Sequence, residues 1–188
     1  MTRRAKGSLA VLLAVACAGG GEQVHAQRRG ETMKVTAADE RKATVTPTDE
    51  GFVRNASGAY QFGSRLAMLA ATRGEGAAGK RFGETLVKDF IELGERMKPA
   101  ASGEKGYQWA HEPQPADEKT LDALERLSGR ELDDALKPQF VALLQRLDAV
   151  FQAEAEKGRD PDLKPLSRDA ATWVKKRLAE AKALPGGA

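Results

Sequence analysis

The stretch Ala78–Met97, AGKRFGETLVKDFIELGERM, decides the fold, because a narrow apolar stripe runs along its whole length. The stripe consists of Ala78, Phe82, Leu86, Phe90, Leu93 and Met97, which follow one another at intervals of four and three residues. That spacing places them on one face of an α-helix, while lysine and glutamate side chains take much of the remaining surface. The stretch therefore predicts an amphipathic helix that buries one face against other helices.

Three further segments carry apolar stripes of the same period, and each predicts a helix. Their residues are Phe52, Ala56, Ala59, Leu66 and Ala70 in the first; Leu132, Leu136, Phe140, Leu143, Leu144, Leu147, Val150 and Phe151 in the second; and Leu163, Leu166, Ala170, Trp173, Val174, Leu178 and Ala181 in the third. No segment shows the alternation of apolar and polar residues that is typical of a β-strand.

Capping residues predict where these helices begin. Thr46 is expected to cap the first helix, with Pro47 at its first position and Asp49 closing a capping box. Residues Ser128–Glu131 form a second capping box before the third helix. Gly158 is expected to stop that helix, and Asp160 and Pro161 are expected to be the cap and the first residue of the last one.

The connections between the stripes predict their arrangement. The first two helices are separated only by the break Thr72–Gly76, so they are expected to form an antiparallel hairpin. Pro99 is expected to end the second helix and open a long crossover, Lys98–Pro115, which leads to a short helix around Leu121–Leu127. Pro138 is expected to kink the third helix. The sequence thus predicts an all-α fold, an antiparallel four-helix bundle with a long crossover that contains a short extra helix.

Residues 1–26 have the order of a secretory signal peptide. A positive start within Arg3–Lys6 precedes an apolar run, Ser8–Ala18, and small or tolerated residues precede a cleavage site after Ala26. The apolar run is shorter than the roughly 20 residues that span a bilayer. We therefore expect export to the periplasm and removal of this segment.

Cys17 supports an alternative processing route. Bacterial lipoproteins are cut just before a cysteine that is then acylated, and the residues around Cys17 resemble such a site, although Ala14 replaces the usual leucine. This route would give an outer-membrane-anchored lipoprotein, the one case in which the chain would contact a membrane. On either route, residues 27–45 are expected to be a flexible polar linker, 46–185 the helical domain and 186–188 a tail.

The net charge argues against nucleic-acid binding. Removing residues 1–26, which hold three basic side chains and one acidic one, would leave 27 basic and 26 acidic side chains. A nearly neutral chain has no net field to attract a nucleic acid or an anionic lipid surface.

The ordered set of helices and short motifs resembles a bacterial family of exported ferritin-like bundles, domain-of-unknown-function family four-one-four-two. The residues that carry the resemblance are Phe52-Val53, Leu66, Leu69-Ala70, Lys80-Arg81-Phe82, Val87-Lys88-Asp89, Leu127-Ser128-Gly129, Phe151, Asp160-Pro161-Asp162-Leu163-Lys164, Leu178 and Ala181. The resemblance extends from Thr46 to about Leu184 and implies a ferritin-like four-helix fold in the cell envelope. It implies no reaction, because the family has no defined one.

Four positions depart from the family's pattern. Members commonly carry three histidines and a glutamate where this chain has Phe90, Leu144, Arg177 and Gly63. None of these side chains can replace a metal ligand, because phenylalanine, leucine and glycine have no donor atom and arginine stays protonated. From the residues alone, the predicted helices contain no histidine, so we expect no metal site, no cofactor and no catalytic residues.

The crossover holds the candidate interaction residues, Tyr107, Trp109 and His111. In one interpretation they form an exposed recognition loop, since tyrosine and tryptophan are frequent in binding hot spots. In the other, Tyr107 and Trp109 pack over one end of the bundle and hold the loop in place, because burying an aromatic ring is strongly favourable.

We therefore expect a non-catalytic helical bundle of the cell envelope, not an enzyme, that acts through contacts with an envelope protein or a surface. Two alternatives remain. One is a ferritin-like metal or redox protein with a degenerate site, and the other is a carrier of a small ligand or lipid that uses the bundle interior near Gly63 and Pro138.

Overall fold

The computed structural model describes residues 47–101 and 105–185, and every regular element in these ranges is helical. The prediction of an all-α fold is confirmed. The helices are α3 (Pro47–Arg73), α4 (Ala77–Ala100), α5 (Pro115–Leu124), α6 (Gly129–Lys157) and α7 (Leu163–Ala183). The predicted signal peptide, the site at Cys17, the linker 27–45, the capping residue Thr46 and the tail 186–188 lie outside the described residues.

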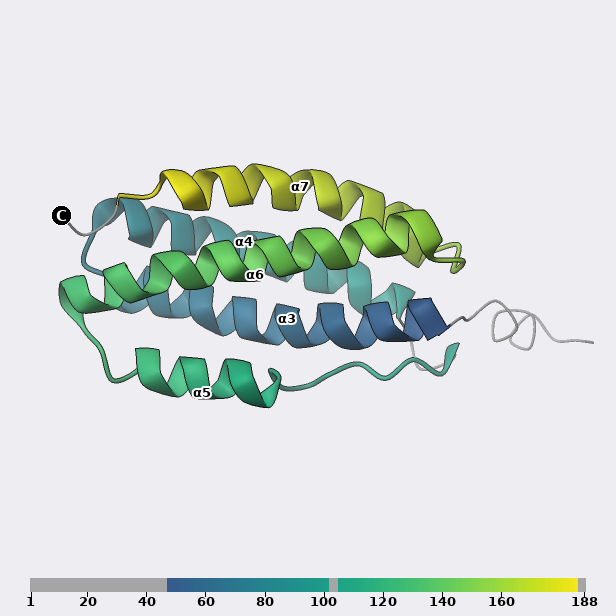
Figure 1. Ribbon diagram of the computed structural model, residues 1–188, viewed down its shortest axis with the longest axis horizontal. Coiled ribbons are helices and arrows are strands. Elements are labelled where there is room, and N and C mark those ends of the chain that lie inside the picture. Colours follow the sequence, from purple (N-terminus) through teal and green to yellow (C-terminus); the bar gives the residue numbers. More distant parts are fainter. Residues whose placement is uncertain (1–46, 102–104, 186–188) are drawn as a thin grey trace, which may run out of the picture. The chain divides into compact units, whose positions relative to one another are not determined.

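Two helical hairpins pack against each other (Figure 1). In each hairpin, α3 with α4 and α6 with α7, the chain reverses within a few residues and the helices run antiparallel. The hairpins meet where α3 contacts α6 and α4 contacts α7. Because α4 and α6 run in the same direction, the chain must return along the bundle between them, which explains the long crossover. Within it, α5 lies beside α3 and also contacts α6.

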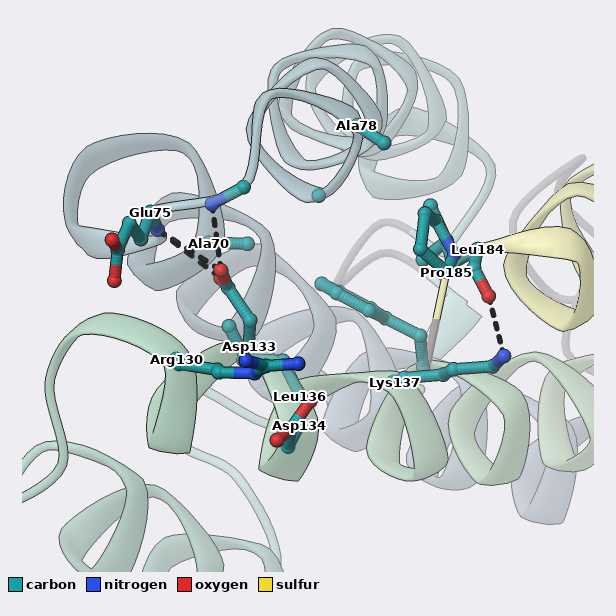
Figure 2. A pocket seen from close by; sticks show the side chains of 13 residues that line it. Ala70, Glu75, Ala78, Arg130, Asp133, Asp134, Leu136, Lys137, Leu184 and Pro185 are labelled. Carbon is teal, nitrogen blue, oxygen red and sulfur yellow. Dashed lines mark hydrogen bonds between the residues drawn. The ribbon is translucent and has the colours of Figure 1, made fainter. Parts of the chain in front are cut away.

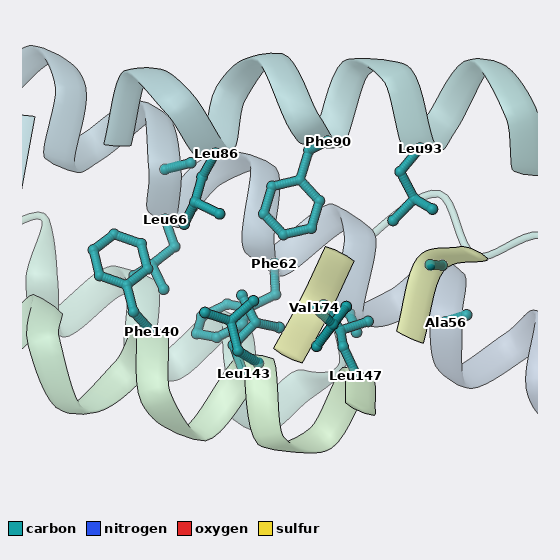
Figure 3. Close-up of a cluster of buried hydrophobic side chains, with 14 of the residues drawn as sticks. Ala56, Phe62, Leu66, Leu86, Phe90, Leu93, Phe140, Leu143, Leu147 and Val174 are labelled. Atoms are coloured by element: carbon teal, nitrogen blue, oxygen red, sulfur yellow. The ribbon is translucent and has the colours of Figure 1, made fainter. Parts of the chain in front are cut away.

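The apolar stripes meet in a single core. Figure 3 shows Leu86, Phe90 and Leu93 of α4 pointing toward α6, which contributes Phe140, Leu143 and Leu147. The ring centroids of Phe82 and Phe140 lie 5.2 Å apart in an edge-to-face arrangement that aromatic pairs favour. Trp173, which we expected in the core, packs against it but remains partly exposed.

Two predicted helix signals were wrong. Pro99 does not block α4, which continues to Ala100. A proline in the last turn removes only one hydrogen bond, and the Ala101 N–H still bonds to the carbonyl of Met97. Ser128 does occupy the N-cap position of α6, but its side chain makes no capping hydrogen bond.

The start of α7 is close to the predicted one. The Asp160 carboxylate accepts hydrogen bonds from the N–H groups of Asp162 and Leu163, at 2.9 and 3.1 Å. The N-cap position itself is taken by Asp162, whose side chain makes no capping hydrogen bond, and not by Asp160 as expected. The α-helix itself begins at Leu163, after a turn at residues 161–162.

Candidate functional site

A buried ion pair fixes the start of the crossover to the turn between α6 and α7. The Lys105 ammonium lies 3.0 Å from both carboxylate oxygens of Asp160, and Tyr107 donates a 2.8 Å hydrogen bond to the same carboxylate. All three side chains are buried. Gly106, between the two crossover residues, has a φ of +81°, a conformation that glycine adopts without the steric cost of a Cβ.

These contacts shift the ionisation of all three groups. Burial raises the pKa of Asp160, but hydrogen bonds from Lys105 and Tyr107 outweigh burial and leave that pKa below its ordinary value. Burial lowers the pKa of Lys105, but its carboxylate partners raise it further, so the net shift is upward. Burial raises the pKa of Tyr107, and the Asp160 carboxylate adds to the effect. At neutral pH the three groups are therefore an ammonium, a carboxylate and a neutral phenol.

The middle of the crossover is held against α3. The Ala110 N–H donates to the Ser57 hydroxyl oxygen at 2.9 Å, and the Gln61 side-chain amide donates to the Ala110 carbonyl at 3.0 Å. Trp109 packs edge-on against Tyr60 of α3, with ring centroids 5.8 Å apart. Residues 107–114 of the crossover form no helix, but these contacts hold the segment in a defined position on the bundle.

The three predicted interaction residues have different surroundings. Tyr107 is buried, Trp109 is half-buried and His111 is exposed. The structure does not bring their side chains into one cluster, since Tyr107 bonds to Asp160 while Trp109 packs on α3. The crossover also presents Gln108 and Glu112 to solvent. Gln108 lines a hollow of about 170 Å³ together with Glu50, Arg54 and Gly106.

A larger cavity lies at the opposite end of the bundle, where α3 turns into α4. It has a volume of about 290 Å³, and its lining includes the apolar Leu136 and Phe140 as well as the charged Lys137. Figure 2 shows Lys137 reaching the Leu184 carbonyl oxygen, to which it donates a hydrogen bond. On the other side, the Asp133 carboxylate accepts hydrogen bonds from the backbone N–H groups of residues 75 and 76 just before α4.

At the four positions that depart from the family's pattern, Gly63, Phe90, Leu144 and Arg177, no side chain places a metal-ligand atom in the core. Phe90 and Leu144 are buried, and the Phe90 ring occupies the space above Gly63. Arg177 faces α4 instead, where it forms a bidentate contact with Asp89 at 2.6 and 3.2 Å. Within residues 47–101 and 105–185, no group of three or more His, Cys, Asp and Glu side chains is arranged to hold a metal ion.

Besides Lys105, sequence reasoning missed the fully buried Glu154. Its side chain meets Asp49, whose carboxylate accepts hydrogen bonds from the N–H groups of Arg159 and Asp160. We call Asp49, Glu154 and Asp160 the acid cluster. A signal did exist, because Glu154 continues the stripe of Leu147 and Phe151 at intervals of four and three residues.

The described domain is an all-helical bundle whose crossover is fixed by a buried ion pair. The profile of the family described as "Domain of unknown function (DUF4142)" matches residues 34–184, so the chain belongs to this family. No curated protein and no solved structure gave a match. None of the helices in the described ranges combines the length and the apolar character needed to cross a membrane.

Proposed function

We propose that this chain is an exported, non-catalytic protein of the cell envelope that acts through contacts with another protein or a surface. Export is supported by the charged, apolar and cleavage regions of residues 1–26. We further propose that its fold is a ferritin-like antiparallel four-helix bundle. The packing of α3, α4, α6 and α7 and the family match support that assignment.

The fixed crossover is the observation that carries the proposed contact function. A segment without regular structure is held at two points, through Lys105 at the α6–α7 turn and through Ala110 on α3. Its exposed side chains, Gln108, His111 and Glu112, therefore have a fixed backbone beneath them. A surface that is ordered before binding loses less conformational entropy when a partner docks.

Photo-crosslinking in the native envelope tests this function. A photoreactive amino acid is introduced at Gln108 or His111, and in a control at Lys176, an exposed position on α7. We expect discrete crosslinked products from the two crossover positions and none of the same mass from the control. The same products from all three positions would contradict the role of the crossover.

The cavity at the α3–α4 turn favours a second candidate, the binding of a small ligand. Its volume of about 290 Å³ is close to the lower end of the 300–1,000 Å³ that is typical of ligand sites. Its lining includes Lys137, the residue before Pro138, but not Gly63, where the Phe90 ring fills the interior. A compound that co-purifies with the native protein in native mass spectrometry, and is lost in an Ala78→Leu variant that fills the cavity, would favour this candidate over the first.

A further inference from the structure

The surroundings of Glu154 favour the protonated, neutral form of its side chain over the carboxylate. Glu154 lies near the end of α6 with no exposed surface, and its side chain packs so closely on Gly158 that no Cβ would fit there. Neither of its oxygens has a hydrogen-bond donor among the described residues. A buried carboxylate without a donor is costly, whereas a protonated Glu154 can itself donate to the Asp49 carboxylate.

Short contacts lead from this carboxyl pair to the crossover. Asp49 Oδ1 accepts the N–H groups of Arg159 and Asp160 at 2.8 and 3.2 Å, which fixes the α6–α7 turn. The Asp160 carboxylate in that turn then holds Lys105 and Tyr107 of the crossover. Three elements, the start of α3, the α6–α7 turn and the crossover, therefore meet at the acid cluster.

We infer that a proton on Glu154 holds the crossover residues 105–111 closed against the bundle, so that the crossover opens more often as the pH rises. Loss of that proton would place three carboxylates together in a buried site. The groups that act on Glu154 are Asp49 on α3, Asp160 in the turn, Lys164 on α7 and Tyr107 on the crossover. Lys105 balances Asp160 and is already paired with Asp162 as well, so it offers little compensation for a further negative charge.

Proton linkage gives the direction in which pH changes the opening of the crossover, and the pH range over which it does so. Burial, and then the hydrogen bond to Asp49, raise the pKa of Glu154 to about 8, against 4.5 for an ordinary glutamate. If opening solvates Glu154, its pKa returns toward 4.5, so opening releases a proton throughout the interval between the two values. The opening equilibrium constant should then rise about tenfold per pH unit within that interval and level off above its upper end.

Asp160, Tyr107 and Lys105 titrate outside this range. The pKa of Asp160 lies below its ordinary value of 3.8, while those of Tyr107 and Lys105 lie above 10.0 and 10.5. Of these four groups only Glu154 titrates between those limits, so we assign the pH dependence there to Glu154. This dependence follows from the charges of the fold, whether or not the crossover contacts a partner.

Hydrogen–deuterium exchange tests the inference on the full mature chain. Exchange of peptides covering residues 105–111 is followed from pH 5.5 to 9 and divided by the intrinsic exchange rate at each pH. We expect the corrected rate in the native protein to rise about tenfold per pH unit up to about pH 8 and then level off. Peptides from the middle of α6 open only when the whole domain unfolds, so their corrected rates should stay far below those of residues 105–111 at every pH. A corrected rate for residues 105–111 that is constant over this range would overturn the inference.

Two matched variants identify the group responsible. In Glu154→Gln the side-chain amide can donate to Asp49 at every pH, so the corrected rate should be independent of pH. Glu156→Gln alters an exposed glutamate on the same helix and should keep the native pH dependence. A pH dependence that persists in Glu154→Gln would assign the effect to another group and overturn the inference.

A direct titration covers the case in which Glu154→Gln does not fold. Carboxyl carbon NMR of the native protein should show one glutamate that titrates near pH 8. If every glutamate titrates in the ordinary range, the proton is absent from Glu154 and the inference fails.

Discussion

At the residue scale, Gly63 and Phe90 show how closely α3 and α4 approach. The Phe90 ring lies where a side chain at position 63 would begin, and the ring is itself buried between Tyr60 and Trp173, at centroid distances of 6.2 and 5.9 Å. The ring cannot move away without displacing these neighbours. Gly63 is therefore required by packing.

Gly63→Ala should lower the free energy of unfolding by about 1–3 kcal/mol, because the added methyl group overpacks the core. The matched control is Gly51→Ala in the same helix, where a Cβ meets nothing within 4 Å. There the loss of backbone freedom in the unfolded chain should stabilise the protein by about 0.5–1 kcal/mol. Urea unfolding of both variants gives the comparison, and equal effects of the same sign would refute the packing argument.

Glu154 should make the global stability depend on pH. Its pKa is higher in the folded protein than in the unfolded chain, so its contribution is complete below about pH 4.5 and is lost as the pH rises toward 8. We expect the free energy of unfolding to fall by about 1.4 kcal/mol per pH unit between pH 5.5 and 7.5 from this group. Asp160 acts in the opposite sense but only at acidic pH, since its pKa is lowered.

Urea unfolding at pH 5.5 and 7.5 measures this dependence. In Glu154→Gln the contribution of this group to the pH dependence of the unfolding free energy should disappear. The stability of the variant relative to the native protein should therefore be higher at pH 7.5 than at pH 5.5. A native protein that is equally stable at both values would show that Glu154 carries no extra proton in the folded state.

The sequence could not have predicted the partners of single polar residues. Asp49 was expected to close a capping box with Thr46, and its contacts with the N–H groups of Arg159 and Asp160 join residues about 110 positions apart. Such pairs depend on the way the hairpins dock, which no local pattern encodes. The same is true of Lys105, since a lone lysine in a polar crossover gives no sign of burial.

At the element scale, the apolar stripes were sufficient to place the long helices. An apolar stripe with a period near 3.6 residues shows which face of a helix is buried. Burial of that face is the main source of stability for helices in proteins. The helix ends were less predictable, because capping depends on tertiary contacts as well as on local sequence. The N–H groups before α4 are capped by Asp133, which comes from α6.

Asp133→Ala should therefore destabilise the protein by about 1 kcal/mol, because N–H groups at the start of α4 lose their acceptor. Ser128→Ala is the control, since Ser128 has the preferred N-cap residue type but makes no capping hydrogen bond. Ser128→Ala should change the free energy of unfolding by no more than about 0.5 kcal/mol. Thermal unfolding of the two variants tests the assignment, and a larger effect at Ser128 would reverse it.

At the scale of the whole molecule, the described helices share one apolar core. The family match covers residues 34–184 and the described helices lie within it. The all-α class could be predicted from the sequence because each long helix carries its own stripe. For Tyr107 and Trp109 the sequence left two interpretations open, an exposed recognition loop and packing on the bundle. Only the docked helices show that Tyr107 is buried and that Trp109 packs on α3.

The intact mass of the protein, measured separately in periplasmic, membrane and cytoplasmic fractions of its native cells, tests the proposed envelope function most directly. We predict a periplasmic chain that begins at Gln27, after removal of the signal peptide. A membrane-bound chain that begins at an acylated Cys17 would retain export and establish the lipoprotein route. A chain that keeps residues 1–26 and remains in the cytoplasm would contradict the proposed function.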